Sequence, residues 1–157
     1  MISLGDSLPH HEFQFLDAEG MAALTTKDLF NNKRVVLFAV PGAFTPTCSE
    51  AHLPGYITLA DQFQAKGVDA IICLAVNDAF VMKAWGDSQN AEAITMLGDG
   101  DGSFCHAMGL AQDTGRFGGL RSQRFSMLAE DGVVKILNVE KPKSFEVSDA
   151  QTMLAQI

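Results

Sequence analysis

A single cysteine stands where an apolar stretch of the chain breaks into a proline-punctuated turn. The stretch is Val35–Val40, the turn is Pro41–Pro46, and Cys48 follows at the predicted start of a helix. The first turn of a helix has unpaired backbone N–H groups and the positive end of the helix dipole, and both favour a thiolate over a thiol. The position therefore predicts a reactive sulfur at Cys48 rather than a buried structural cysteine.

Two alternative capping patterns mark the start of this helix. Thr45 can be the N-cap with Pro46 at the first helical position, or Thr47 can be the cap with Glu50 completing a capping box. Both alternatives place Cys48 in the first helical turn. The Thr45 hydroxyl can donate its proton to a reacting group while its oxygen accepts a backbone N–H, so capping and chemistry are compatible.

The chain has three cysteines, and their spacing gives neither a Cys-x-x-Cys pair nor a metal-ligand array. This usage fits a reducing compartment in which one thiol is kept for chemistry. Cys73 lies inside an apolar predicted strand, where we expect a buried and inert thiol. Cys105 follows a glycine-rich turn, where we expect partial exposure.

Short apolar runs alternate with longer mixed segments, which is typical of an α/β fold with a mixed sheet. Two nearly continuous apolar strands flank the long predicted helix and indicate a parallel strand–helix–strand unit. The predicted strands are Glu12–Leu16, Arg34–Val40, Asp69–Val76, Ile94–Leu97, Arg124–Ala129 and Val133–Val139. The predicted helices are Thr26–Phe30, Thr47–Lys66, Asp78–Asp87, Ser103–Leu110 and Asp149–Ala155.

Local signals add detail to these elements. Pro54 lies inside the long helix and predicts a kink. Asp131-Gly132 predicts a two-residue hairpin turn, so the last two strands are expected to be antiparallel. Ser148 with Gln151 predicts a capping box at the start of the last helix. The aspartates of Gly98–Gly102 resemble a calcium loop, but no closing glutamate follows, so we expect only a turn.

Length and composition fit one globular domain over residues 1–157, in which 47% of the residues are hydrophobic. A net charge of −8 argues against nucleic acid as a partner. No apolar run is long enough to cross a bilayer, and the first residues do not follow the pattern of a secretory or transit sequence. We therefore expect a cytoplasmic protein with no membrane partner.

The segment around Cys48 resembles the peroxiredoxins, which are thiol peroxidases with a thioredoxin-like fold. Their Pro-x-x-x-Thr-x-x-Cys pattern is met by Pro41, Thr45 and Cys48, and the wider string is typical of the type II, peroxiredoxin-five-like branch. The likeness covers nearly the whole chain and implies a mixed central sheet with helices on both faces. Further matching segments are His52–Pro54, Val76–Val81, Arg124–Met127 and, as in bacterial peroxiredoxin–glutaredoxin hybrids, Val147–Ala150.

This resemblance implies a role for each matched residue. Cys48 would be the peroxidatic nucleophile, which becomes a sulfenic acid as water or an alcohol leaves. Arg124 would lie beside the sulfur and donate from its guanidinium to sulfur and peroxide. Thr45 would donate its hydroxyl proton to the same atoms, and Pro41 would shield the sulfur from water.

Other basic residues offer weaker alternatives. His52, four residues after Cys48, could form the nucleophile–base pair of a thiol hydrolase, but no oxyanion-hole or orienting-residue pattern accompanies it. Arg116 and Arg121 are expected to be solvated surface residues.

Many relatives have a resolving cysteine near the C-terminus, whereas Lys141–Val147 contains none. The resemblance therefore implies a one-cysteine cycle, with hydrogen peroxide and alkyl hydroperoxides as substrates and glutathione or glutaredoxin reducing the Cys48 sulfenic acid. No bound cofactor is expected, because glutathione is a co-substrate. The resemblance also implies a homodimer, with Phe44, Phe80 and Trp85 as candidate contacts. The alternative is a peroxide-sensing switch or interaction protein that uses Cys48 without sustained turnover.

Overall fold

The computed structural model describes residues 1–157, which fold around a seven-stranded sheet. The strands are β1 (Glu12–Asp17), β2 (Gly20–Thr25), β3 (Arg34–Ala39), β4 (Ala70–Ala75), β5 (Thr95–Gly98), β6 (Ala111–Asp113), β7 (Leu120–Ser122), β8 (Phe125–Glu130) and β9 (Val133–Val139). The helices are α1 (Thr26–Phe30), the π-helical turn η1 (Cys48–His52), α2 (Leu53–Ala65), α3 (Ala79–Ser88), α4 (Ser103–Ala107) and α5 (Ala150–Gln156). None of these helices is long and apolar enough to cross a membrane.

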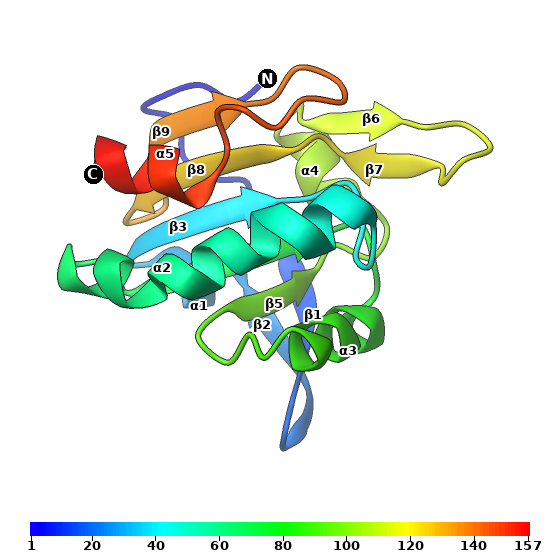
Figure 1. Cartoon of the computed structure of the whole chain (residues 1–157), viewed down its shortest axis with the longest axis horizontal. Helices are drawn as coiled ribbons and strands as arrows, with labels where there is room; N and C mark the ends of the chain where they lie inside the picture. Colours follow the sequence, from blue (N-terminus) through cyan, green and yellow to red (C-terminus); the bar gives the residue numbers. More distant parts are fainter.

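The main sheet has the strand order β2-β1-β5-β4-β3-β8-β9, and its strands run in both directions (Figure 1). β3, β4 and β5 are parallel, whereas β1, β8 and β9 join by antiparallel pairing. The chain passes from β3 through η1 and α2 to β4, as the predicted strand–helix–strand unit requires. β6 and β7 form a separate two-stranded arm that projects from the body of the molecule. The predicted α/β fold with a mixed, thioredoxin-like sheet is confirmed.

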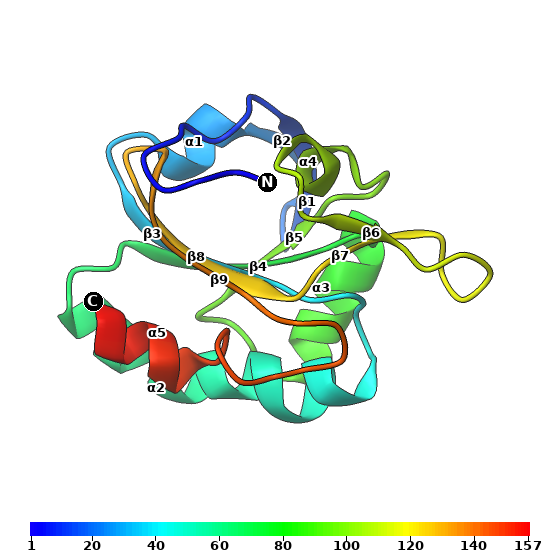
Figure 2. The same ribbon diagram turned by 90° about the horizontal axis from the view of Figure 1, so that it is seen from above.

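Helices cover both faces of the sheet, with α1 and α4 on one side and α2, α3 and α5 on the other (Figure 2). Alternate side chains of β3 divide between two apolar clusters. Val36 and Phe38 pack into the cluster that contains α2 and α3, and Val35 and Leu37 pack into the cluster on the opposite face. All four side chains are fully buried. Burial on both faces explains why β3 has a continuous apolar sequence.

The hairpin between β8 and β9 is confirmed. Asp131 and Gly132 have φ angles of 51° and 74°, the left-handed values that a type I′ turn requires at both central residues. Glu130 and Val133 pair directly across this turn. The turn fixes β9 at the edge of the sheet next to β8.

Three strands were not predicted from the sequence. β6 and β7 have only three residues each, which is too short for a hydrophobic period to be detected. β2 is Gly-Met-Ala-Ala-Leu-Thr, whose glycine and alanines have low strand propensity. Pairing along the whole length of β1 therefore stabilises β2 more than its own composition does.

The ends of two helices also differ from the prediction. α5 is capped by Asp149, whose carboxylate accepts from the Thr152 N–H at 3.1 Å, so the predicted capping box at Ser148 is wrong. The Ser148 hydroxyl is buried and donates to Glu140 at 2.7 Å instead. α4 is shorter than predicted, because Gly109 takes a left-handed φ of 70° soon after its last residue.

Candidate active site

The helix that carries Cys48 begins with an irregular turn. After β3 the chain bends through a short loop and becomes helical at Pro46. The next turn is π-helical, with the Leu53 N–H donating to the Cys48 carbonyl. Pro54 has no N–H for the regular α-helical pattern, and the irregularity predicted there takes the form of this wider turn instead of a simple kink.

Neither predicted cap is formed at the start of this helix. Thr47 has helical backbone angles and makes no side-chain cap hydrogen bond. Thr45 precedes the first helical residue, but its hydroxyl donates to the Gly42 carbonyl at 2.7 Å and accepts no backbone N–H. The Thr45 carbonyl accepts from the Ser49 N–H at 2.9 Å. In this state the Thr45 proton therefore stabilises the turn and is not bonded to sulfur.

Arg124 lies beside the sulfur of Cys48, although 76 residues separate the two in the sequence. Its Nη2 donates to Sγ at 3.1 Å. The pairing of β8 with β3 brings them together, because Phe125 at the start of β8 lies opposite Ala39 at the end of β3. A guanidinium at this distance stabilises negative charge on the sulfur.

Cys48 is fully buried, although the sequence predicted a reactive sulfur in place of a buried structural cysteine. The sulfur faces the apolar cluster that includes Phe38 and Tyr56 as well as the guanidinium of Arg124. Burial in apolar surroundings strengthens the electrostatic effect of the one cation that contacts the sulfur. It also restricts which reactants can reach the sulfur.

His52 holds the other end of the Arg124 guanidinium. Its Nδ1 lies 2.9 Å from Nη1 of Arg124, and its Nε2 lies 3.0 Å from the Ser148 carbonyl. Because Arg124 can only donate and the Ser148 carbonyl can only accept, the His52 ring has one arrangement of protons, in which Nδ1 accepts and Nε2–H donates. The imidazole is therefore neutral, and burial followed by the charge of Arg124 lowers its pKa to about 3.

The hydrolase alternative is not supported by this geometry. Both ring nitrogens of His52 are engaged, and neither contacts the sulfur of Cys48. A neutral ring that accepts from arginine cannot also remove a proton from the thiol. His52 acts on Cys48 only through Arg124, as a positioning residue.

A buried polar network in turn fixes His52. The Ser148 carbonyl that accepts from His52 also accepts from the Tyr56 hydroxyl at 2.9 Å. The Glu140 carboxylate anchors the same segment by accepting the Ser148 N–H at 2.8 Å and the Ser148 hydroxyl at 2.7 Å. Residues 140–148 thus connect to the sulfur through histidine and arginine. Sequence reasoning missed this network, because it involves a backbone carbonyl that no motif marks.

Lowering the pH from 6.5 to about 5 is expected to destabilise the fold through His52. The pKa of the imidazole is 6.5 without the fold and about 3 within it. In this window the unfolded chain binds a proton that the folded protein does not, so the free energy of unfolding falls with a slope that approaches about 1.4 kcal/mol per pH unit near pH 5. Urea unfolding at the two pH values measures the loss. His52→Gln, which cannot titrate, should lose less, and equal losses in both proteins would contradict the assignment.

Two residues outside the loop before Cys48 form hydrogen bonds to its backbone. The Asn77 side-chain oxygen accepts from the Ala43 N–H at 3.0 Å. Arg121 is half-buried and donates to the carbonyls of Gly118 at 3.0 Å and Pro41 at 3.4 Å. The prediction that Arg121 is a solvated surface residue is therefore wrong. It ties the β6–β7 arm to the active-site loop.

The other two cysteines are poorly suited to attack. Burial raises the pKa of Cys73 well above its usual value, and the residue lies in the same apolar cluster as Cys48. Burial, followed by the charge of Asp99, raises the pKa of Cys105 to about 12. Cys105 is fully buried, so its predicted partial exposure is wrong. Both thiols are neutral at physiological pH, and all three cysteines are free.

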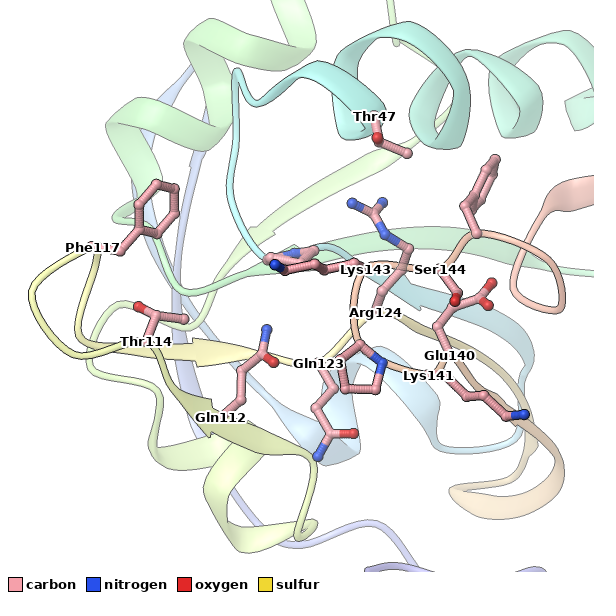
Figure 3. A pocket seen from close by; sticks show the side chains of 13 residues that line it. Thr47, Gln112, Thr114, Phe117, Gln123, Arg124, Glu140, Lys141, Lys143 and Ser144 are labelled. Atoms are coloured by element: carbon pink, nitrogen blue, oxygen red, sulfur yellow. The ribbon is translucent and has the colours of Figure 1, made fainter.

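An open cavity of about 560 Å³ lies over Arg124. Figure 3 shows the guanidinium of Arg124, the residue before β8, pointing towards the helix end at Thr47, with the 141–145 loop on one side and the β6–β7 arm on the other. No group of three or more His, Cys, Asp and Glu side chains is placed to hold a metal ion. The lining residues are Pro41, Thr47, Gln112, Thr114, Phe117, Gln123, Arg124, Glu140, Lys141, Pro142, Lys143, Ser144 and Phe145.

Three of the four predicted site residues gather around this cavity and the sulfur. Pro41 and Arg124 line the cavity, and Arg124 donates a hydrogen bond to the sulfur of Cys48. Thr45 lies in the same loop, but its hydroxyl donates to the Gly42 carbonyl and not to the sulfur. The arrangement provides a sulfur, an adjacent cation and a cavity over that cation, which suits reaction of an anionic nucleophile with a small polar substrate.

Comparison with known proteins gives the same picture. The Redoxin family model matches residues 3–154. Peroxiredoxin-2E-2, chloroplastic, of Oryza sativa subsp. japonica is 46% identical over 160 residues, which cover 98% of this chain and 71% of that protein. Hybrid peroxiredoxin hyPrx5 of Haemophilus influenzae is 44% identical over 154 residues, 96% of this chain and 64% of that protein.

Solved structures of similar sequence have the same fold. Reduced Prx3 in complex with H2O2 from Vibrio vulnificus is 63% identical and superimposes with a TM-score of 0.97 over 99% of both chains. Peroxiredoxin 5 from Alvinella pompejana is 32% identical and superimposes with a TM-score of 0.87 over 99% of this chain and 97% of that one.

Proposed function

The chain belongs to the type II branch of the peroxiredoxins, a family of thiol peroxidases, and we propose that it uses Cys48 as the peroxidatic sulfur and glutathione or glutaredoxin as reductant. Hydrogen peroxide and alkyl hydroperoxides are the proposed substrates. The observation that carries the assignment is the 3.1 Å contact between Arg124 Nη2 and Cys48 Sγ.

The oxidation step follows from this contact. The Cys48 thiolate attacks the terminal oxygen of the peroxide, so that a sulfur–oxygen bond forms while the oxygen–oxygen bond breaks. The hydroxyl group stays on sulfur as a sulfenic acid, and the departing alkoxide or hydroxide takes a proton from water. Two electrons pass from sulfur to peroxide. Arg124 stabilises the thiolate before attack and the negative charge on the oxygens during it.

We propose that external thiols reduce the sulfenic acid. One glutathione condenses with it to give a mixed disulfide and water, and a second glutathione or glutaredoxin thiol attacks that disulfide and restores the Cys48 thiolate. The neutral, buried state of Cys73 and Cys105 supports this pathway, because neither supplies a thiolate. The use of glutaredoxin is proposed from the resemblance of Val147–Ala150 to bacterial peroxiredoxin–glutaredoxin hybrids, and one relative is named a hybrid peroxiredoxin.

Mass spectrometry after one equivalent of hydrogen peroxide and then glutathione tests the pathway. We expect a single glutathione adduct on Cys48, followed by steady peroxide consumption when glutathione and glutaredoxin are both present. A Cys48–Cys73 or Cys48–Cys105 disulfide as the main product, with turnover unaffected by glutathione, would overturn the proposal. Consumption that stops after one equivalent would instead indicate the peroxide-sensing switch.

We also propose a homodimer that covers the apolar surface beside the site. Phe44 and Phe80 are 56% and 64% exposed, so both side chains are available for contact with a second copy of the chain. Trp85, the third candidate contact, is buried and donates to the Ser49 hydroxyl at 3.0 Å, so it belongs to the core and that prediction is wrong. Light scattering measures the mass in solution.

The proposed location is the cytoplasm. Its support is the set of three unpaired cysteines, which suits a reducing compartment. The rice relative, by contrast, is a chloroplastic protein.

A further inference from the structure

The cavity over Arg124 is much larger than a peroxide requires. Its volume of about 560 Å³ lies in the range of pockets that hold small organic ligands. The lining includes the side-chain amides of Gln112 and Gln123 and the hydroxyl of Thr114, which can donate or accept hydrogen bonds. A second reactant, larger than the peroxide and able to form several polar contacts, fits this space.

The cavity is positive although the chain is acidic. Its charged lining residues are Arg124, Lys141, Lys143 and Glu140, three cations and one anion, whereas the whole chain has a net charge of −8. The Glu140 carboxylate accepts the backbone N–H groups of Glu146, Val147 and Ser148 at 2.8–2.9 Å. Its charge is thus already satisfied by the loop and only weakly offsets the lysines.

Lys143 is the cation that best fits a ligand contact. It has a left-handed φ of 65°, which is unusual for a residue other than glycine, asparagine or aspartate. Figure 3 shows its side chain extending across the cavity, while the side chain of Lys141 points away. Neither lysine forms an ion pair, since the three in the structure join His11–Asp99, Arg34–Glu130 and Lys83–Asp87.

We infer that this cavity is a carboxylate-binding subsite for the reducing thiol, in which Lys143 receives a carboxylate of a peptide-like thiol while its sulfur is held over Arg124, the residue that contacts Cys48. The inference rests on the proposed use of glutathione, whose two carboxylates make it an anion. An anionic thiol is repelled by the overall charge of the protein, so a local cation beside the cavity raises its concentration at the site. The subsite predicts a preference for carboxylate-bearing thiols over uncharged thiols of similar reactivity.

Binding of S-methylglutathione, which cannot react, tests the subsite directly. We expect amide chemical-shift titration of the reduced protein to show that Lys143→Gln weakens binding about two- to five-fold, the effect of one exposed charge pair. Lys135→Gln is the matched control, because Lys135 is an exposed lysine of β9 outside the cavity. It removes the same net charge and should leave the binding constant unchanged.

Kinetics with two thiols give a second readout. Lys143→Gln should raise the KM for glutathione by a similar factor and leave the KM for 2-mercaptoethanol unchanged. Equal binding of S-methylglutathione by the wild type and Lys143→Gln, or equal weakening in Lys135→Gln, would refute the subsite. An effect confined to oxidation by a carboxylate-bearing hydroperoxide would also refute it, by assigning the cavity to the peroxide.

Failure of this inference is distinguishable from failure of the proposed function. S-methylglutathione binding does not depend on turnover, whereas peroxide consumption by the wild type with glutathione and glutaredoxin tests the proposed pathway alone.

Discussion

Cys48→Ser is expected to reduce peroxide consumption to the uncatalysed rate, while Cys73→Ala and Cys105→Ala keep turnover close to that of the wild type. A serine hydroxyl is not ionised at neutral pH and cannot form a sulfenic acid. The other two thiols cannot replace Cys48, because burial raises the pKa of each of them above physiological pH. Only Cys48 has a cation in contact with its sulfur.

Peroxide consumption by the three variants, measured with the same reductant, separates the roles of the cysteines. Far-ultraviolet circular dichroism and urea unfolding serve as controls for folding, since all three side chains are fully buried. Residual turnover in Cys48→Ser above background would move the nucleophile to another cysteine. Loss of turnover in Cys73→Ala with an intact fold would make that thiol part of the cycle.

The fold could be predicted from the sequence wherever strands are buried on both faces. β3 and β4 are continuous apolar runs, and the Asp131-Gly132 turn fixes the β8–β9 hairpin, so the parallel unit and its antiparallel extension were both accessible. The short β6 and β7 strands could not be predicted, because their pairing depends on the segment that connects them and not on a periodic pattern.

The candidate site was predictable only to the extent that side chains form motifs. Cys48 was found from its position at the start of a helix, Arg124 and Pro41 were found through the family pattern, and the structure brings them together where β3 ends and β8 begins. Arg121 was misjudged and the positioning role of His52 was missed, because each has a partner that is a backbone carbonyl far away in the sequence. Backbone carbonyls are present in every residue, so no composition or spacing marks them as partners.

Burial of Cys48 is the feature that sequence reasoning described least well. The helix start was predicted, but its π-helical turn and the apolar surroundings of the sulfur depend on packing against β3 and α2. The Arg124 contact therefore becomes more important, because a buried sulfur has few other groups to stabilise its charge.

Arg124→Lys should lower the second-order rate constant for reaction with hydrogen peroxide by more than about tenfold, equivalent to at least about 1.4 kcal/mol of transition-state stabilisation. Lysine keeps the positive charge, so the loss of rate measures the contribution of the guanidinium geometry. The planar guanidinium contacts Cys48 through Nη2 and His52 through Nη1, whereas one ammonium group cannot hold both positions. The amine is therefore free to move away from the sulfur and from the oxygens that become negative.

Stopped-flow measurement of Cys48 oxidation gives this rate constant without the reductive steps. Arg116→Lys is the matched control, because Arg116 is exposed and lies in the β6–β7 arm, and its rate constant should equal that of the wild type. A third variant, Arg124→Gln, removes the charge as well and should be slower than Arg124→Lys. If Arg124→Lys reacts as fast as the wild type while folding normally, the bidentate geometry contributes nothing to catalysis. A loss only in Arg124→Gln would assign the effect to charge alone.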